Sequence, residues 1–118
     1  MGLTHVVVKL NSDSAEKYEA SFLVDTGALD SMAPASALQK VGIEPLGKEL
    51  YELASGELRE YEHGEAKLRF MDEVVTTRII FGPEDIEPIL GVLALETAGY
   101  IVDPKSQTLR KLRARPLK

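Results

Sequence analysis

The 118-residue chain has no cysteine, no tryptophan and only two histidines. Without cysteine it has no disulfide framework, no thiolate zinc site and no cysteine nucleophile. His5 and His63 lie far apart and neither belongs to an i, i+4 ligand pair, so we expect no metal ion and no other cofactor. The chain also lacks a run of the roughly 20 apolar residues that cross a bilayer, and its N-terminus lacks a signal-peptide pattern. We therefore expect no membrane partner and a cytoplasmic location.

Negative charge is missing from the end of the chain. Residues 105–118 hold six of the 14 bases and no acid, whereas the first 104 residues hold all 19 acids. The acidic body repels phosphate backbones and the basic end has no interleaved aromatic residue, so nucleic acid is not an expected partner. We interpret this end as a solvated terminus that keeps the protein soluble or pairs with its own acidic body. The alternative is that residues 105–118 dock a protein partner.

Short β-prone runs separated by turn formers fill most of the chain. Short helices are expected at residues 35–41 and 92–98, each with a glycine after its end. Gly64 is expected to break the strand in which it lies. The expected strands cover residues 3–10, 17–24, both arms of a hairpin over 49–70 with its turn at 54–57, 74–81, 100–102 and 109–112. The pattern predicts one mainly-β, barrel-like domain over residues 1–112 and a basic tail over residues 113–118.

The sharpest motif is an apolar run, Phe22-Leu23-Val24, that ends at Asp25-Thr26-Gly27-Ala28. A strand this apolar delivers Asp25 to a site with little water, where a carboxylate can act in acid–base chemistry. Gly27 allows a tight turn with backbone close to a ligand, and the Thr26 hydroxyl can lock the loop by a hydrogen bond. These are the requirements of carboxylate catalysis on a peptide bond.

Such catalysis needs two aspartates that share one proton, because two carboxylates about 3 Å apart cannot both ionise. One then activates water as a base while the protonated one polarises the carbonyl. Only Asp25 is followed by Thr-Gly; the other aspartates are Asp13, Asp30, Asp72, Asp85 and Asp103. A second copy related by a two-fold axis would supply the second Asp25, so we expect a homodimer.

The order of these motifs resembles that of the retropepsin-like aspartic proteases, the single-lobe relatives of pepsin found in retroviruses and many bacteria. The resemblance runs through Asp25-Thr26-Gly27-Ala28, a flap-like hairpin around Ser55-Gly56, and Ile89-Leu90-Gly91 followed by a helix. The sequence is most similar to a bacterial subgroup of this family that has Asp-Ser-Met-x-Pro after the catalytic triplet, here Asp30-Ser31-Met32-Ala33-Pro34. The resemblance implies a closed acid-protease β-barrel with one or two short helices, dimeric, with flaps that cover a peptide or protein substrate.

The resemblance also implies roles for single residues. Thr26 would bond across the dimer, and the Ile-Leu-Gly element would pack under the catalytic loop. The residues expected to support that loop are Thr26, Gly27, Ala28, Ile89, Leu90 and Gly91. Those expected to contact substrate are Asp30, Ala54, Ser55 and Gly56.

Two positions depart from the viral pattern. Viral members commonly have an Asp two residues beyond the Gly and an Arg directly after the Leu-Gly, where this chain has Leu29 and Val92. Both partners of that ion pair are replaced together, so no orphaned buried charge is implied. The hairpin tip carries no aromatic residue, although Tyr51 and Tyr61 lie on its arms.

Other polar residues have simpler interpretations. Ser31 lies in no Gly-x-Ser-x-Gly elbow, so it is read as a loop or cap residue and not as a nucleophile. His63 is read as a surface hairpin residue and not as a proton relay. A solvated hairpin face accounts for Glu57, Glu60, Glu62 and Glu65.

The sequence thus predicts an aspartic endopeptidase that hydrolyses peptide bonds with a water activated by Asp25 from two subunits. The alternative is a catalytically weak retropepsin-like module for dimerisation or peptide binding. An intact Asp-Thr-Gly favours the enzyme, because simple binding does not require a carboxylate in a desolvated dyad.

Overall fold

The computed structural model describes residues 4–11, 15–103, 105–106, 108–114 and 117. Residue 3 of the first expected strand and residues 115, 116 and 118 of the expected tail lie outside this description. The helices are α1 (Ala35–Lys40) and α2 (Val92–Ala98). The strands are β1 (His5–Leu10), β2 (Tyr18–Val24), β3 (Ser31–Pro34), β4 (Gly47–Glu52), β5 (Leu58–Phe70), β6 (Glu73–Gly82), β7 (Ile89–Leu90), β8 (Tyr100–Val102) and β9 (Leu109–Lys111).

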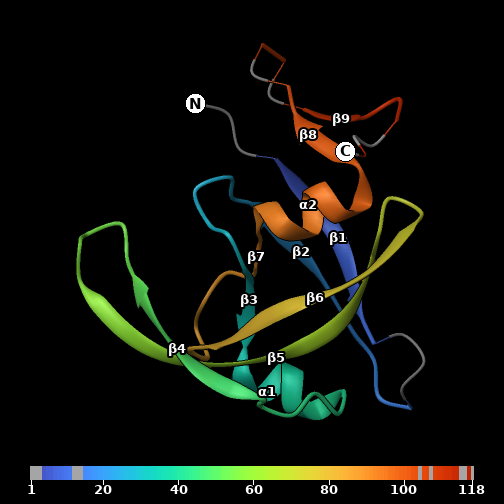
Figure 1. Ribbon diagram of the computed structural model, residues 1–118. Coiled ribbons are helices and arrows are strands. Elements are labelled where there is room, and N and C mark those ends of the chain that lie inside the picture. The colour runs from blue at the N-terminus through green and yellow to red at the C-terminus, as the bar shows by residue number, and fades with distance from the viewer. Residues whose placement is uncertain (1–3, 12–14, 104, 107, 115–116, 118) are drawn as a thin grey trace.

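Six of the strands close into a barrel. They follow the order β1-β2-β7-β3-β6-β5, and β5 pairs back to β1 at Lys9–Arg69 and Leu10–Leu68. β4 extends the sheet beyond β5, while β8 and β9 form a separate hairpin on the far side of α2 (Figure 1). The expected closed, mainly-β barrel with two short helices is confirmed.

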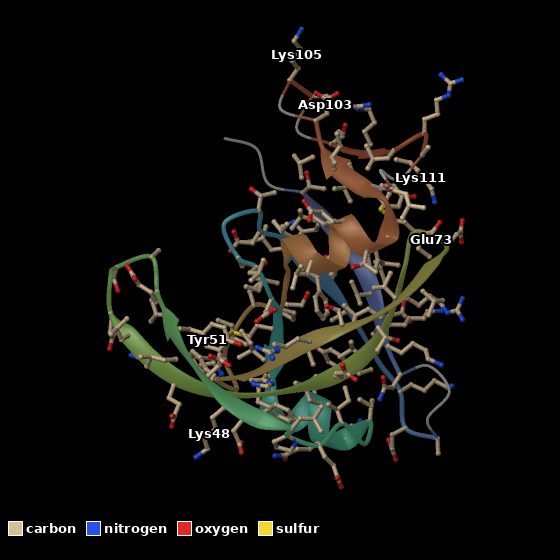
Figure 2. The ribbon with its side chains drawn as sticks, viewed as in Figure 1. Lys48, Tyr51, Glu73, Asp103, Lys105 and Lys111 are labelled. Atoms are coloured by element: carbon tan, nitrogen blue, oxygen red, sulfur yellow. The ribbon has the colours of Figure 1, made fainter. Side chains whose placement is uncertain are left out.

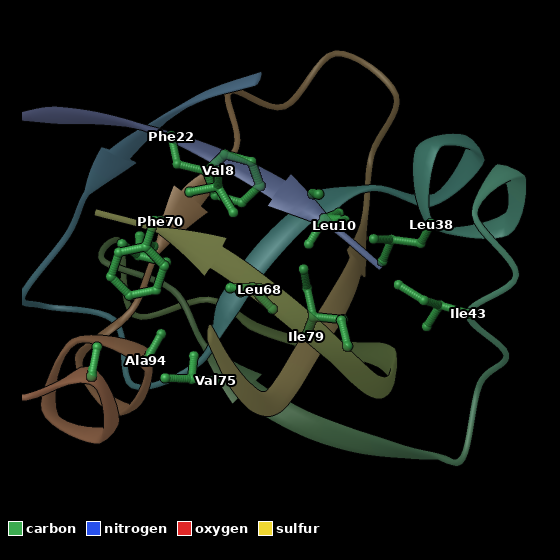
Figure 3. Packing of buried hydrophobic residues seen from close by; sticks show 14 of the residues in the cluster. Val8, Leu10, Phe22, Leu38, Ile43, Leu68, Phe70, Val75, Ile79 and Ala94 are labelled. Carbon is green, nitrogen blue, oxygen red and sulfur yellow. The ribbon is translucent and has the colours of Figure 1, made fainter. Parts of the chain in front are cut away.

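The core is a single apolar cluster inside the barrel (Figure 3). On β5 the alternation of Ala66, Leu68 and Phe70 with exposed residues turns one face inward, as a half-buried strand requires. Leu38 on α1 and Leu95 on α2 belong to the same cluster, so both helices pack on the barrel. Burying each large apolar side chain contributes about 1.5–3 kcal/mol to folding.

Two expectations about the long hairpin were wrong. Gly64 does not break β5, because β5 continues through it from Leu58 to Phe70. A Cβ on Gly64 would lie 2.6 Å from the carbonyl oxygen of Glu44, so the residue is glycine because two backbone segments approach closely there. His63 is not a surface residue: it is 9% exposed and packs under Gly47. The four glutamates read as a solvated face are all exposed, as expected.

β3 was not expected from the sequence. It is four residues long and ends at Pro34, so it gives too short a pattern to recognise. Pairing with its neighbours makes this segment a strand: β3 lies between β6, to which it is parallel, and β7, to which it is antiparallel. This central position puts the residues just before β3, including Asp30, beside the barrel interior.

The β8–β9 hairpin is fixed to the barrel by its last residues. The Leu112 N–H donates to the carbonyl of Gly99 at 2.7 Å, one residue beyond the Tyr100–Lys111 pair, and so extends the hairpin itself. The ammonium of Lys111 bonds the carboxylate of Glu73, and both residues are labelled in Figure 2. The same ammonium lies 5.3 Å from the centre of the buried Tyr100 ring. Arg110 pairs with Asp103 at 4.0 Å, so two of the C-terminal cations face acids of the same chain. No helix of the described residues is long and apolar enough to span a membrane.

Candidate active site

Asp25 follows the C-terminal end of β2, and β7 fixes its backbone. β2 and β7 run parallel, with Val24 opposite Leu90. The Asp25 N–H donates to the Leu90 carbonyl at 3.0 Å, extending the pairing by one residue. The apolar β2 run and the Ile-Leu element therefore meet beneath this aspartate, although they lie more than 60 residues apart in sequence.

The Asp25 side chain closes the turn that follows it. One of its carboxylate oxygens accepts a hydrogen bond from the Gly27 N–H at 2.9 Å. Its carbonyl accepts from the Ala28 N–H at 3.1 Å. A Cβ on Gly27 would stand 3.3 Å from that carboxylate oxygen, so a larger residue would press on it. The turn thus fixes the orientation of the Asp25 carboxylate, with one oxygen engaged by the backbone.

The start of α2 binds the other side of the loop that residues 25–30 form, which we call the Asp25 loop. The Val92 N–H donates to the Ala28 carbonyl at 2.9 Å and the Leu93 N–H to the Leu29 carbonyl at 3.1 Å. A Cβ on Gly91 would lie 2.6 Å from backbone atoms of Asp30 and Leu29. Only glycine allows this approach, so Gly91 lets the helix and the loop share backbone hydrogen bonds.

Ser31 supplies a further link that sequence reasoning did not foresee. It is the first residue of β3 and is 1% exposed, and its hydroxyl oxygen accepts a hydrogen bond from the Gly91 N–H at 3.0 Å. It is therefore neither a nucleophile at the surface nor a simple loop residue. The sequence clue to this bond is that a hydroxyl residue stands directly after the Asp25 loop, where the backbone N–H of Gly91 needs an acceptor.

A cavity of about 670 Å³ opens beside the Asp25 loop. Its lining residues are Asp25, Gly27, Ala28, Leu29, Asp30, Met32, Tyr51, Glu52, Leu53, Ala54, Tyr61, Ile80 and Ile89. Of the residues expected at the site, Asp25, Gly27, Ala28, Asp30, Ala54 and Ile89 meet here. Thr26, Ser55 and Gly56 are exposed and do not line the cavity, and Leu90 and Gly91 are buried behind the loop.

The hairpin of β4 and β5 forms one wall of this cavity. Its turn extends away from the barrel (Figure 1). Its turn is closed by the Leu53 N–H donating to Glu57 and the Gly56 N–H donating to Leu53, both at 2.8 Å. Gly56 has φ +87°, a conformation that glycine adopts without strain. The turn residues make these local bonds and are exposed, as a flap-like element requires.

Asp30 and Tyr51 meet in the wall of the cavity. The Tyr51 hydroxyl donates to an Asp30 carboxylate oxygen at 2.9 Å, and Asp30 is 6% exposed. Burial, and then the hydrogen bond to Asp30, raise the pKa of Tyr51 to about 12, although nearby Arg78 opposes the shift. The Tyr51 and Tyr61 rings lie 6.2 Å apart, a tilted aromatic contact. Sequence reasoning noted both tyrosines as arm residues but did not predict this pairing.

Among the described residues, no group of three histidine, aspartate or glutamate side chains gathers as a metal site. The functional groups in the cavity wall are carboxylates and phenols. Their chemistry is that of proton transfer and hydrogen bonding.

The architecture is similar to that of solved aspartic proteases. EIAV protease, complexed with the inhibitor HBY-793, aligns with a TM-score of 0.60 and 18% identity over 83% of this chain and 89% of its own. A retropepsin-like aspartic protease from Rickettsia conorii aligns with a TM-score of 0.47 and 22% identity over 84% of each chain. No family model and no curated protein matches the sequence.

The closed barrel and the EIAV likeness define the class: this is a retropepsin-like fold, the single-lobe fold of aspartic proteases. In this chain that fold carries Asp25-Thr26-Gly27 on a loop between β2 and β3. The resemblance inferred from the order of the motifs is confirmed for the fold.

Proposed function

We propose that the protein is a homodimeric aspartic endopeptidase in which Asp25 from each of two subunits activates a water against a peptide bond. The observation that carries the proposal is the position of Asp25, oriented by its own loop at the wall of a peptide-sized cavity beneath the β4–β5 hairpin. The likeness of the fold to EIAV protease supports it.

A second subunit is needed because one chain offers one suitable carboxylate. Of the acids in the cavity wall, Asp30 is engaged by Tyr51, and Glu52 lies on the hairpin. The surface around the Asp25 loop suits a partner: Thr26 is exposed, Leu29 is 62% exposed and Leu93 on α2 is 37% exposed. Burying these side chains between two copies would remove apolar surface from water.

In the proposed reaction the two Asp25 carboxyl groups share one proton. The ionised carboxylate takes a proton from water, whose oxygen attacks the carbonyl carbon, while the protonated partner donates its proton to the carbonyl oxygen. The resulting neutral tetrahedral diol collapses when one hydroxyl returns its proton and the leaving nitrogen receives one. The products are a carboxylic acid and an amine, and the dyad regains its single proton.

The proposal extends to the whole chain as the sequence suggested. Residues 1–112 would form the peptidase domain and residues 113–118 a basic tail, in a cytoplasmic protein that acts on peptide or protein substrates. Thr26 would bond across the two-fold axis, and Ala54, Ser55 and Gly56 would approach the substrate when the hairpin closes. Ile89, Leu90 and Gly91 would support the loop beneath the reacting atoms.

Hydrolysis of an unfolded casein-like substrate at mildly acidic pH tests the proposal. The wild-type protein should cleave it, and Asp25→Asn should reduce the rate at least about 100-fold while leaving the circular dichroism spectrum unchanged. Equal rates for wild type and Asp25→Asn would overturn the assignment. A dimer that binds the peptide without hydrolysing it would support the binding-module alternative instead.

A further inference from the structure

The β4–β5 hairpin touches the Asp25 loop through one hydrogen bond between side chains. The donor is the hydroxyl of Tyr51 on β4, and the acceptor is the carboxylate of Asp30, 21 residues earlier. A carboxylate that is 6% exposed costs several kcal/mol to desolvate unless its oxygens are bonded. The Tyr51 hydroxyl lowers this cost for Asp30, so the buried position of the carboxylate and the position of the hairpin depend on each other.

Neighbouring side chains hold Tyr51 in this position from two directions. Tyr61 on β5 contacts its ring at 6.2 Å between centroids. Arg78 on β6 lies near enough to the Tyr51 hydroxyl to act on its pKa, and it pairs with Glu49 on β4 at 3.8 Å. Tyr51 therefore connects β4, β5 and β6 to the Asp25 loop at one point.

The bond divides the hairpin into two parts. β4 and β5 pair regularly from Gly47–His63 up to Tyr51–Arg59 at the bond, and one further pair, Glu52–Leu58, lies beyond it. Beyond that pair, the turn at residues 53–57 is held by its own backbone bonds, and residues 54–57 are exposed. The arms are thus tied to the loop beside Asp25, while the turn can move about that tie.

We propose that the Tyr51–Asp30 hydrogen bond is a latch that holds the β4–β5 hairpin against the Asp25 loop, with Tyr51 as a positioning residue for substrate binding. In this proposal Tyr51 acts through Asp30 and the hairpin, and no role on the reacting atoms is assigned to it. The part of the proposal that concerns substrate rests on the proposed peptidase function; the part that concerns the hairpin does not.

Amide hydrogen exchange of the full-length protein tests the latch without any substrate. Tyr51→Phe keeps the ring and removes the hydroxyl, and loss of one charge-assisted bond should speed exchange over residues 47–58 by about 10-fold. Tyr61→Phe is the matched control, because the Tyr61 hydroxyl interacts with Arg59 on its own strand. Exchange in β1 and β2 should stay at the wild-type rate in both variants.

Two substitutions of the acceptor make the test specific. Asp30→Asn keeps an oxygen that accepts from Tyr51 and should retain slow exchange, whereas Asp30→Ala should exchange as fast as Tyr51→Phe. Wild-type exchange over residues 47–58 in Tyr51→Phe would overturn the latch. So would equal acceleration in Tyr61→Phe, because the hairpin would then respond to any lost hydroxyl.

Kinetics separate this inference from the proposed function. If the wild-type protein hydrolyses peptides, Tyr51→Phe should raise KM by about 5–10-fold and change kcat less than about twofold. A lowered kcat with unchanged KM would overturn the positioning role. If the wild-type protein hydrolyses nothing, the peptidase proposal fails, while exchange over residues 47–58 still decides the latch.

Discussion

Ser31 and Gly91 are 60 residues apart in sequence, and the Ser31 hydroxyl accepts the Gly91 N–H at 3.0 Å inside the protein. This bond joins the first residue of β3 to the residue before α2. Together with the two backbone bonds from α2 to Ala28 and Leu29, it fixes the Asp25 loop from behind. The geometry of the candidate catalytic aspartate therefore depends on residues that never contact a substrate.

Removing the Ser31 hydroxyl should destabilise the protein. Ser31→Ala leaves the buried Gly91 N–H without an acceptor, which costs about 1–3 kcal/mol. Ser21→Ala, an exposed serine on β2, is the matched control and should change stability by less than about 0.5 kcal/mol. Urea unfolding followed by circular dichroism measures both, and equal midpoints for the two variants would contradict the role given to Ser31.

A methyl group on Gly91 should displace the Asp25 loop. In Gly91→Ala the added Cβ would stand 2.6 Å from the carbonyl oxygens of Asp30 and Leu29, and backbone atoms cannot move away as a flexible side chain can. We expect a loss of about 2–4 kcal/mol of stability and, if the proposed function holds, loss of peptidase activity.

Thermal unfolding measures the effect of Gly91→Ala, with the exposed Glu62→Ala on β5 as a control that should unfold near the wild-type temperature. A Gly91→Ala protein as stable as Glu62→Ala would show that the loop and α2 can separate without cost.

Alkaline pH should weaken the latch over a defined range. Folding raises the pKa of Tyr51 from 10.0 to about 12, first through burial and then through the bond to Asp30. The stability that Tyr51 contributes is therefore complete below pH 10 and is lost as the pH rises from about 10 to about 12, because the unfolded phenol ionises first. Burial also raises the pKa of Tyr18, so absorbance of the phenolate should show late-titrating tyrosines in the wild type, and the one that titrates near pH 12 should be absent from Tyr51→Phe.

Charge on the exposed Asp25 loop should prevent association. In Leu29→Asp an acid replaces a side chain that is 62% exposed, so the single chain should fold normally. In the proposed dimer each new carboxylate would be buried without the arginine that accompanies it in viral members, because this chain has Val92 there, and an unpaired buried charge is costly. Sedimentation velocity should show a dimer for the wild type and a monomer for Leu29→Asp, with activity lost in parallel.

Leu46→Asp is the control for association, because Leu46 is 69% exposed and precedes β4, away from the loop. It should sediment as the wild type does. A Leu29→Asp protein that dimerises as tightly as Leu46→Asp would remove Leu29 from the proposed interface.

Local patterns predicted much of this fold. The second arm of the 49–70 hairpin, the glycine that ends α2, and the apolar run before Asp25 each depend on neighbours in sequence. Each was predicted close to its observed bounds, apart from the break wrongly expected at Gly64. The Asp25 loop could be proposed because its motif is contiguous. The resemblance to retropepsins then supplied the closed barrel, which no single segment encodes.

Contacts between distant segments could not be predicted in this way. His63 is buried because β4 covers it at Gly47, and a sequence shows which residue faces inward only when the register is known. The Tyr51–Asp30 bond requires β4 to cross above the Asp25 loop, a result of the curvature of the sheet. Ser31 acquires its partner only through the placement of β7 beside β3.

The parallel pairing of β2 with β7 also has a consequence for biosynthesis. Asp25 emerges from the ribosome long before its backbone acceptor at Leu90 and the helix that holds its loop. Pairings so remote in sequence form late, because closing a long loop costs entropy before any contact repays it. A nascent chain therefore carries its aspartate in an unsupported segment until Leu90 and α2 have also been made, which delays assembly of the site.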